Sequence, residues 1–258
     1  MVDDVRSCME FVVEAAWQAG KITLSYFQTG VEVDAKADQS PVTIADREAE
    51  IKLRELIRLY YPNDGIEGEE FGREEGTSGY SWLLDPIDGT KSFVQGVPLY
   101  GVLLAREGAE GVDVGCVYLP ALNEMVWAGR GEGCWWNGRR ANVSETEKIE
   151  DACICFTSWM NFAASQRDAV WQGLTEKVRL VRGWGDCYGH ILVATGRADA
   201  SFDPAMNPWD CGPLLTILEE AGGTFTDWNG RPTVRGKDAF STNGRLFQTV
   251  LSELNSNQ

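Results

Sequence analysis

Apolar residues recur at a helical period near the start of the chain. Between residues 4 and 28 the positions that set this period are Val5, Cys8, Met9, Val12, Ala16 and Ala19. Gly30 follows as a stop signal, so we expect an amphipathic helix over this range. A second helix is predicted near Thr43, because Thr43 and Asp46 have the spacing of a capping box. Its apolar stripe consists of Ala49, Leu53, Leu56 and Ile57.

Short apolar runs predict strands along the rest of the chain. In the first half they lie at residues 82–84, 101–105 and 112–119, followed by a Gly-rich hairpin region at 129–138. In the second half we expect strands at 152–156, 198–202 and 224–228, and helices at 164–178, 186–195 and 210–221. This order lacks the regular alternation of a doubly wound parallel sheet. The pattern therefore favours one folding unit, in which a mixed or antiparallel sheet is layered with helices.

Composition narrows the class of protein. A chain of 258 residues suits one large domain or two fused lobes, and 43% hydrophobic residues are enough for a core. Asp and Glu outnumber Lys and Arg by 39 to 23, which gives a net charge of -16. That sign argues against nucleic acid as a partner. An anionic substrate would need a bound metal ion to overcome the negative field.

Membrane insertion and secretion are not expected. The longest stretch without a charged residue covers 15 positions, 152–166, which is short of the roughly 20 apolar residues of a membrane span. The chain begins with acidic residues where a secretory signal would be basic. Its seven cysteines are odd in number and contain no Cys-x-x-Cys pair, so buried thiols are expected. We therefore predict a cytoplasmic protein.

Carboxylates stand at the ends of predicted elements, where side chains can converge on a cavity. They are Glu69 and Glu70 after Gly68, Asp85 and Asp88 around Pro86, and Asp210 after Trp209. Hard oxygen ligands of this kind select Mg²⁺ or a similar divalent ion. A histidine-based site is excluded because the chain has one histidine, His190, for which we expect a structural role.

The segment from Asp85 to Thr90 reads Asp-Pro-Ile-Asp-Gly-Thr. The proline fixes one backbone angle and the glycine allows close approach to a ligand, so both acids can face one point. If Gly89 and Thr90 open the next helix, their amides offer donors to a phosphate group. A surface turn rich in Asp and Gly is the alternative interpretation.

Three motifs in order resemble the signatures of the inositol monophosphatase family. They are Gly68-Glu69-Glu70, the run from Trp82 to Phe93, and Trp209-Asp210 with the later Glu220-Ala221-Gly222-Gly223. The resemblance covers nearly the whole chain, because the first helix, Lys36, Asp46 and the Gly-rich middle also fall at the expected places. Members of this family are Mg²⁺-dependent, Li⁺-sensitive phosphomonoesterases.

The resemblance implies an α+β fold, the layered αβαβα sandwich of the inositol monophosphatase and fructose-1,6-bisphosphatase type. The chain would form a single catalytic domain, residues 1–258. Its N-terminal lobe, about 1–145, would carry most metal ligands, and its C-terminal lobe, about 146–258, would carry Asp210 and the selectivity segments. A homodimer is also implied.

The resemblance further implies two to three Mg²⁺ ions per active site. One would be held by Glu69, Asp85 and the Ile87 carbonyl, and a second by Asp85, Asp88 and Asp210. A third, looser ion would contact Glu69 and mostly water. An attacking water would be activated without a covalent intermediate.

Three side chains are implied as catalytic. Glu69 and the Thr90 hydroxyl would orient the nucleophile, and Asp46 would hold Thr90 in place. A capping role alone is the alternative for Asp46. An aspartyl-phosphate mechanism is the weaker chemistry, since it uses Asp-x-Asp-Gly-Thr, and here Asp85 and Asp88 are three apart.

Two segments near the C-terminal half address selectivity. Residues 183–190 and 203–210 are similar to the histidinol-phosphate phosphatases of this family. Their carboxylates, Asp186 and Asp203, suit the ammonium and imidazole groups of histidinol, and Asp88, Gly89, Thr90 and Asp210 complete the expected substrate contacts. Local capping is the alternative for both acids.

We therefore predict hydrolysis of L-histidinol phosphate, a small phosphate monoester, in histidine biosynthesis. Hydrolysis of inositol-1-phosphate or another small sugar or nucleotide phosphate is the enzymatic alternative. A degenerate protein that only binds metal or phosphate is the non-enzymatic one.

Overall fold

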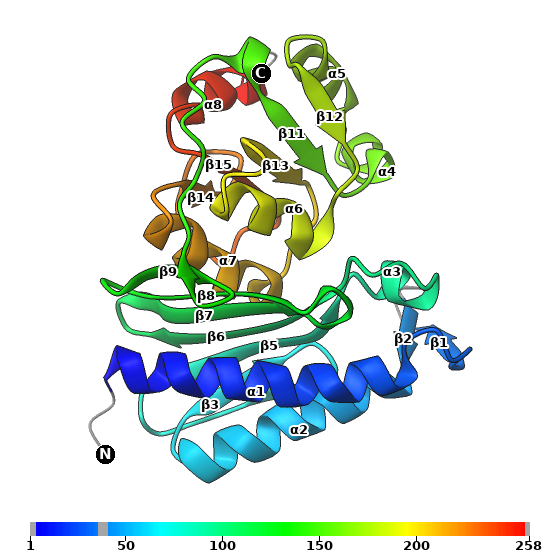
Figure 1. Cartoon of the computed structure of the whole chain (residues 1–258), viewed down its shortest axis with the longest axis vertical. Coiled ribbons are helices and arrows are strands. Elements are labelled where there is room, and N and C mark those ends of the chain that lie inside the picture. Colours follow the sequence, from blue (N-terminus) through cyan, green and yellow to red (C-terminus); the bar gives the residue numbers. More distant parts are fainter. Residues whose placement is uncertain (1–3, 36–40, 256–258) are drawn as a thin grey trace.

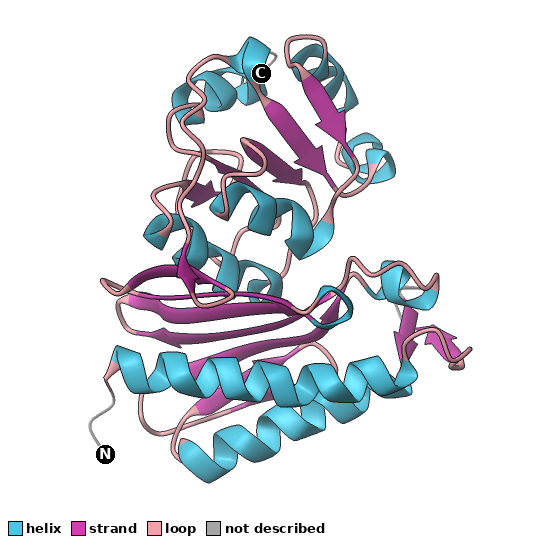
Figure 2. Ribbon diagram, in the orientation of Figure 1, coloured by secondary structure: helices cyan, strands magenta, loops and turns pink. Residues whose placement is uncertain are grey.

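The computed structural model describes residues 4–35 and 41–255, and Lys36 lies outside these ranges. Its helices and sheets stack in alternating layers, which run from bottom to top in Figure 1. Two long helices are followed by an eight-stranded sheet, a pair of helices, a five-stranded sheet and three outer helices. Figure 2 shows the same alternation by element type. The α+β sandwich expected from the sequence is confirmed.

The first two layers come from the N-terminal part of the chain. Helices α1 (Val5–Tyr26) and α2 (Ile44–Tyr60) cover one face of the large sheet. The sheet has the order β10-β9-β8-β7-β6-β5-β3-β4, and within it only β3 and β5 pair in parallel. Its strands are β3 (Gly65–Gly68), β4 (Gly72–Glu74), β5 (Ser81–Asp88), β6 (Gly101–Gly108), β7 (Gly111–Leu119), β8 (Glu124–Gly129), β9 (Gly133–Trp136) and β10 (Arg139–Arg140).

Both faces of the large sheet are buried, which explains its continuous apolar runs. Successive side chains of a strand point to opposite faces. In β5, Trp82 and Leu84 therefore pack against α1 and α2, whereas Leu83 joins the central core. In β6, Leu103 and Leu104 divide between the two cores in the same way.

The remaining layers come from the C-terminal part. Helices α6 (Asp186–Ala194) and α7 (Pro208–Glu220) lie between the two sheets. The small sheet has the order β12-β11-β13-β15-β14. Its strands are β11 (Cys153–Phe156), β12 (Leu180–Arg182), β13 (Ala200–Asp203), β14 (Thr224–Thr226) and β15 (Ala239–Thr242). The outer helices are α4 (Trp159–Ala164), α5 (Asp168–Thr175) and α8 (Phe247–Asn255).

Smaller elements connect these layers. A hairpin of β1 (Val33–Ala35) and β2 (Pro41–Thr43) precedes α2, and α3 (Thr90–Val94) follows β5. Short 3-10 turns lie at Pro120–Leu122 and Ile149–Asp151.

The helix predicted over 164–178 is present but shorter, because α5 spans Asp168–Thr175. Gln166 before it has a φ of 58°, in the left-handed region, and separates α5 from α4, a helix that was not predicted. The Ser158 hydroxyl accepts the Met160 amide at 3.2 Å and caps the start of α4. Strands β12 and β15 and helix α8 were not predicted.

All seven cysteines are buried, as expected from their odd number. In the ranges 4–35 and 41–255, no helix combines the length and the apolar character that crossing a membrane requires.

Candidate active site

The first two acidic motifs meet because their strands are parallel. Strands β3 and β5 run side by side with Gly68 opposite Leu84, so the residues that follow, Glu69 and Asp85, emerge at the same edge. The Glu69 amide donates to the Leu84 carbonyl at 3.1 Å, which extends the pairing by one residue. The carboxyl ends of neighbouring parallel strands are a common location for ligand sites in α/β sheets.

An irregularity in β5 brings Asp88 to the same place. The pairing of β5 with β6 shifts register between Asp85 and Asp88, across Pro86 and Ile87. The Ile87 amide donates to Asp85 Oδ1 at 3.0 Å, which fixes the first carboxylate within this bulge. Bulges often redirect side chains beside active sites.

The third acidic motif arrives from the C-terminal part. Asp210 lies in the first turn of α7, where its Oδ2 accepts the Asn207 amide at 2.7 Å. One carboxylate oxygen each from Asp85, Asp88 and Asp210 lies within 4.8 Å of the other two. The structure therefore brings together acids that are more than a hundred positions apart in the chain.

Burial and mutual repulsion raise the pKa values of this cluster. Burial is the main cause for Asp85, whose pKa lies well above 3.8, followed by the charges of Glu69, Asp88 and Asp210. Burial, then the neighbouring Asp210, raises the pKa of Asp88 to about 7. The pKa of Asp210 is also about 7, chiefly through burial. Buried carboxylates this close together are relieved by a cation, and the all-oxygen donor set fits a hard divalent ion.

Asp46 both caps α2 and contacts the Thr90 hydroxyl. Its Oδ2 accepts the Thr43 amide at 2.8 Å, which completes the capping box of α2. Its Oδ1 faces the Thr90 hydroxyl at 3.4 Å, and this hydroxyl also donates to the Ile87 carbonyl at 3.0 Å. The start of α2 is thereby joined to the segment that carries the acidic cluster.

Gly89 and Thr90 open a helix, which meets the condition set for their amides to offer donors to a phosphate group. Gly89 is the N-cap of α3 and has a φ of 83°, in the left-handed region that favours glycine. A side chain there would also be crowded, because a Cβ would lie 3.0 Å from the Leu99 carbonyl and 3.1 Å from Asp186 Oδ2.

A cavity of about 530 Å³ opens beside the cluster, between the large sheet and the C-terminal layers. Its lining includes four acids, Asp88, Asp186, Asp203 and Asp210, and the Cys187 amide, next to Asp186, donates to Asp88 Oδ2 at 2.5 Å. The remaining lining residues are Lys91, Ser92, Thr157, Ser158, Asn161, Cys187, Ala205, Met206, Asn207 and Leu214. Four acids thus share one cavity with a single lysine.

Thr157 links Asp186 to Asp203 by two hydrogen bonds. Its hydroxyl accepts the Asp186 amide at 2.7 Å and donates to Asp203 Oδ2 at 2.5 Å. Asp203 Oδ1 is buried and has no hydrogen-bond partner among the described residues. Burial raises the pKa values of Asp186 and Asp203 to about 7. The charge of Asp88 adds to the increase at Asp186, and the charge of Asp186 adds to the increase at Asp203. The positive charge of Lys91 lowers the pKa values of both groups.

Capping of α6 by the Asp186 side chain is not observed. The N-cap is Gly185, and no side chain caps this helix end. Asp186 instead has a φ of 51°, a conformation uncommon for aspartate. Its carboxylate lines the cavity beside Gly89.

Thr157, Lys91 and Glu50 were missed by the sequence analysis. Thr157 lies one residue beyond β11, and no local pattern links it to Asp203, 46 positions later. Glu50 did leave a weak signal in the sequence, because it is a charged residue next to Ala49 of the apolar stripe of α2. The structure shows that its side chain is fully buried.

His190 lies in the core, as the structural interpretation requires. Its Nδ1 bonds the Ser241 hydroxyl at 2.8 Å, and its ring packs edge-on against Phe225. Burial lowers its pKa to about 3, so the imidazole is neutral near pH 7.

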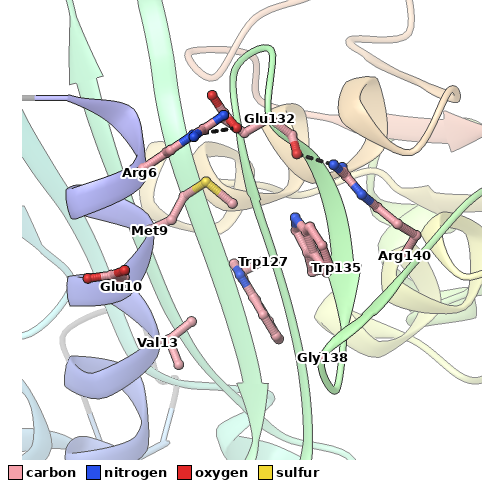
Figure 3. Close-up of a pocket in the computed structure, with 9 residues that line it drawn as sticks. All are labelled: Arg6, Met9, Glu10, Val13, Trp127, Glu132, Trp135, Gly138 and Arg140. Carbon is pink, nitrogen blue, oxygen red and sulfur yellow. Dashed lines mark hydrogen bonds and ion pairs between the residues drawn. The ribbon is translucent and has the colours of Figure 1, made fainter.

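A second hollow, of about 560 Å³, lies between α1 and strands β8 and β9 (Figure 3). Trp127 of β8 and Trp135 of β9 are among the residues that line it. Glu132 accepts Arg6 Nε at 2.9 Å through its carboxylate, and its carbonyl accepts Arg140. None of the residues that line this hollow belongs to the acidic cluster.

Comparisons with known proteins agree with this geometry. A model described as the inositol monophosphatase family matches residues 4–257. The histidinol-phosphatase of Chlorobaculum parvum is 39% identical over 97% of both chains, and that of Mycobacterium tuberculosis is 37% identical over 88% of this chain and 89% of its own. The solved IMPase of Thermotoga maritima superposes with a TM-score of 0.88 at 30% identity, covering 97% of each chain.

Proposed function

Because the chain belongs to the inositol monophosphatase family, we propose that it is a Mg²⁺-dependent phosphomonoesterase that converts L-histidinol phosphate to L-histidinol and phosphate. Such a step belongs to histidine biosynthesis. The observation that carries the substrate assignment is the pair of additional acids in the cavity, the half-buried Asp186 and the buried Asp203. Two histidinol-phosphatases among the relatives support the same assignment.

The acidic cluster supports a metal site with two to three ions. Glu69, Asp85 and the Ile87 carbonyl would hold one, and Asp85, Asp88 and Asp210 another. Bound there, divalent cations supply an activated water and neutralise the charge of the phosphate group.

The surrounding residues would direct the reaction. Glu69 and the Thr90 hydroxyl orient the attacking water, and Asp46 keeps Thr90 beside the Ile87 carbonyl. Water adds its oxygen to phosphorus, the ester P–O bond breaks, and the departing alkoxide takes up a proton. Gly89 and Thr90, at the first turn of α3, offer backbone amides to the phosphate oxygens.

Asp186 and Asp203 would select the alcohol. Asp203 Oδ1 has no partner among the described residues, and an ammonium or imidazolium donor would satisfy it. Cation binding would also favour the ionised forms of Asp186 and Asp203, whose pKa values burial raises to about 7. A neutral polyol provides no such charge.

Inositol-1-phosphate remains the second candidate substrate, because the Thermotoga maritima neighbour is an IMPase with the same fold. A side-by-side phosphate-release assay separates the two. It should use histidinol phosphate, inositol-1-phosphate, fructose-1,6-bisphosphate and adenosine 3',5'-bisphosphate, each with Mg²⁺ and with EDTA. We expect a clear preference for histidinol phosphate and no release in EDTA. Comparable rates on the first two substrates would contradict the substrate assignment, and release in EDTA would contradict the metal dependence.

We also expect the enzyme to act in the cytoplasm as a homodimer. Size-exclusion chromatography with light scattering measures the second point, and a monomer at working concentration would contradict it.

A further inference from the structure

The inner face of α2 carries a row of polar side chains spaced by four residues. Asp46, Glu50 and Arg54 are all buried, although charged residues are rarely buried without partners. Residues four apart share one helix face, so the three side chains point toward the same edge of the large sheet. Asp46 contacts the segment after β5 through Thr90. The other two residues are not explained by capping or by hydrophobic packing.

Glu50 binds the turn that carries Glu69. Its Oε2 accepts the Glu70 amide at 2.7 Å, and its Oε1 accepts the Phe71 amide at 3.2 Å. These two amides immediately follow Glu69 in the turn between β3 and β4. Bonds between a carboxylate and backbone amides are among the stronger hydrogen bonds in proteins. Glu50 therefore fixes the backbone directly after Glu69.

Arg54 fixes Glu50 in turn. Its Nε donates to Glu50 Oε1 at 2.8 Å, and its Nη2 donates to the Gly72 carbonyl at the start of β4. The Glu50 carboxylate thus binds the amides within the turn between β3 and β4, and the Arg54 guanidinium binds the carbonyl of Gly72 at its end.

Gly68 makes this arrangement possible. A Cβ at this position would lie 2.1 Å from Glu50 Oε1 and 2.5 Å from Glu50 Cδ. The φ of Gly68 is not in the left-handed region, so the glycine is needed for space and not for backbone conformation. In the motif Gly68-Glu69, Glu69 is therefore the candidate metal ligand, and Gly68 leaves the space that the Glu50 side chain occupies.

We propose that Glu50 is a positioning residue that sets the affinity of the active site for its divalent cation by fixing the turn that presents Glu69. The inference rests on the proposed function only in taking Glu69 as a metal ligand, and it is independent of the substrate. Loss of a residue that supports a metal ligand typically lowers metal affinity or activity by about 10- to 100-fold.

The test is calorimetric titration of Mg²⁺ into the metal-free full chain, without substrate. Glu50→Gln should weaken Mg²⁺ binding by at least about tenfold. At saturating Mg²⁺ the variant should recover most of its kcat for phosphate release, since the ligands themselves remain. The matched control is Asp113→Asn, which breaks the buried Arg106–Asp113 pair of 2.8 Å in the same sheet. This control should lower the melting temperature but leave Mg²⁺ affinity unchanged.

Gly68→Ala provides a second variant should Glu50→Gln fail to fold, because it displaces Glu50 without removing a polar group. It should weaken Mg²⁺ binding in the same direction. Unchanged Mg²⁺ affinity in folded Glu50→Gln or Gly68→Ala would overturn the inference and leave Glu50 a purely structural residue. A wild-type chain that binds no Mg²⁺ would overturn the proposed function itself, and a wild-type chain that binds Mg²⁺ but prefers another phosphate ester would leave the role of Glu50 standing.

Discussion

The Thr157 hydroxyl donates a hydrogen bond of 2.5 Å to Asp203 Oδ2. Because the hydroxyl oxygen of Thr157 also accepts the Asp186 amide, one small side chain links Asp186 and Asp203, the two acids proposed to face the substrate alcohol. Hydrogen bonds to charged groups contribute about 1.5–3 kcal/mol. We expect Thr157→Val to raise the KM for histidinol phosphate by about tenfold, measured by phosphate release, and to change the KM for inositol-1-phosphate much less.

Thr157→Ser is the matched control for that prediction, since it keeps the hydroxyl and loses only the methyl group. It should stay close to the wild type with both substrates. Equal losses on both substrates in Thr157→Val would instead indicate a general structural effect.

Asp203→Asn tests the charge of the selectivity pocket directly. The substitution keeps the shape of the side chain but removes the negative charge that would attract an ammonium or imidazolium group. The kcat/KM for histidinol phosphate should fall by about tenfold or more, which corresponds to at least about 1.4 kcal/mol. The preference over inositol-1-phosphate should shrink with it, and an unchanged ratio would remove Asp203 from substrate selection.

Asp85→Asn separates catalysis from binding alone. Asp85 is buried, feels the charges of Glu69 and Asp88, and is a proposed ligand in both ion sites, so its loss should abolish measurable turnover. The metal-free variant should also melt at a higher temperature than the metal-free wild type, because one buried repelling charge is gone. Thermal melts in EDTA measure this effect. Residual turnover near the wild-type level would contradict the metal site as assigned.

Metal-free protein should become less stable as the pH rises through 7. In the folded state the pKa values of Asp88, Asp186, Asp203 and Asp210 are raised from 3.8 to about 7, so the folded chain binds protons more tightly than the unfolded chain. The resulting stabilisation is fully present below pH 3.8 and is lost through pH 7. Melts in EDTA should show a higher melting temperature at pH 5.5 than at pH 8, and Mg²⁺ should reduce the difference. A melting temperature independent of pH in EDTA would contradict the buried charge repulsion.

His190 should make the folded protein less stable as the pH falls, which is the opposite of the effect of the four aspartates. Its pKa is lowered from 6.5 to about 3 by burial, so the unfolded chain binds the proton more tightly. The free energy of unfolding should then fall by up to about 1.4 kcal/mol per pH unit below 6.5. Comparison of the wild type with His190→Asn in Mg²⁺-saturated urea titrations isolates this slope, since the chain has a single histidine. Parallel pH profiles would show that His190 titrates normally in the fold.

The acidic cluster could be predicted from the sequence because each carboxylate stands where an element ends. Glu69 and Asp85 follow two strands that pair in parallel, and Asp210 lies in the first turn of a helix, so local pattern and family resemblance agree. The order of predicted elements favoured a mixed or antiparallel sheet layered with helices, and the family resemblance implied the αβαβα sandwich.

The supporting contacts could not be predicted because they depend on distant parts of the chain. Thr157 reaches Asp203 across 46 positions, and Glu50 reaches Glu70 across 20. The helix predicted over 164–178 begins later than expected for a local reason, since the left-handed conformation of Gln166 has no strong signal in its residue type. Apolar spacing alone does not reveal a break of that kind.

The placement of Asp210 in the helix layer between the two sheets has a consequence for biosynthesis of the chain. The ribosome releases the large sheet, with Glu69, Asp85 and Asp88, well before it releases α7. A nascent polypeptide whose large sheet has already emerged would therefore hold an incomplete set of the proposed ligands. Full cation affinity would arise only after α7 has been synthesised and has docked on the large sheet.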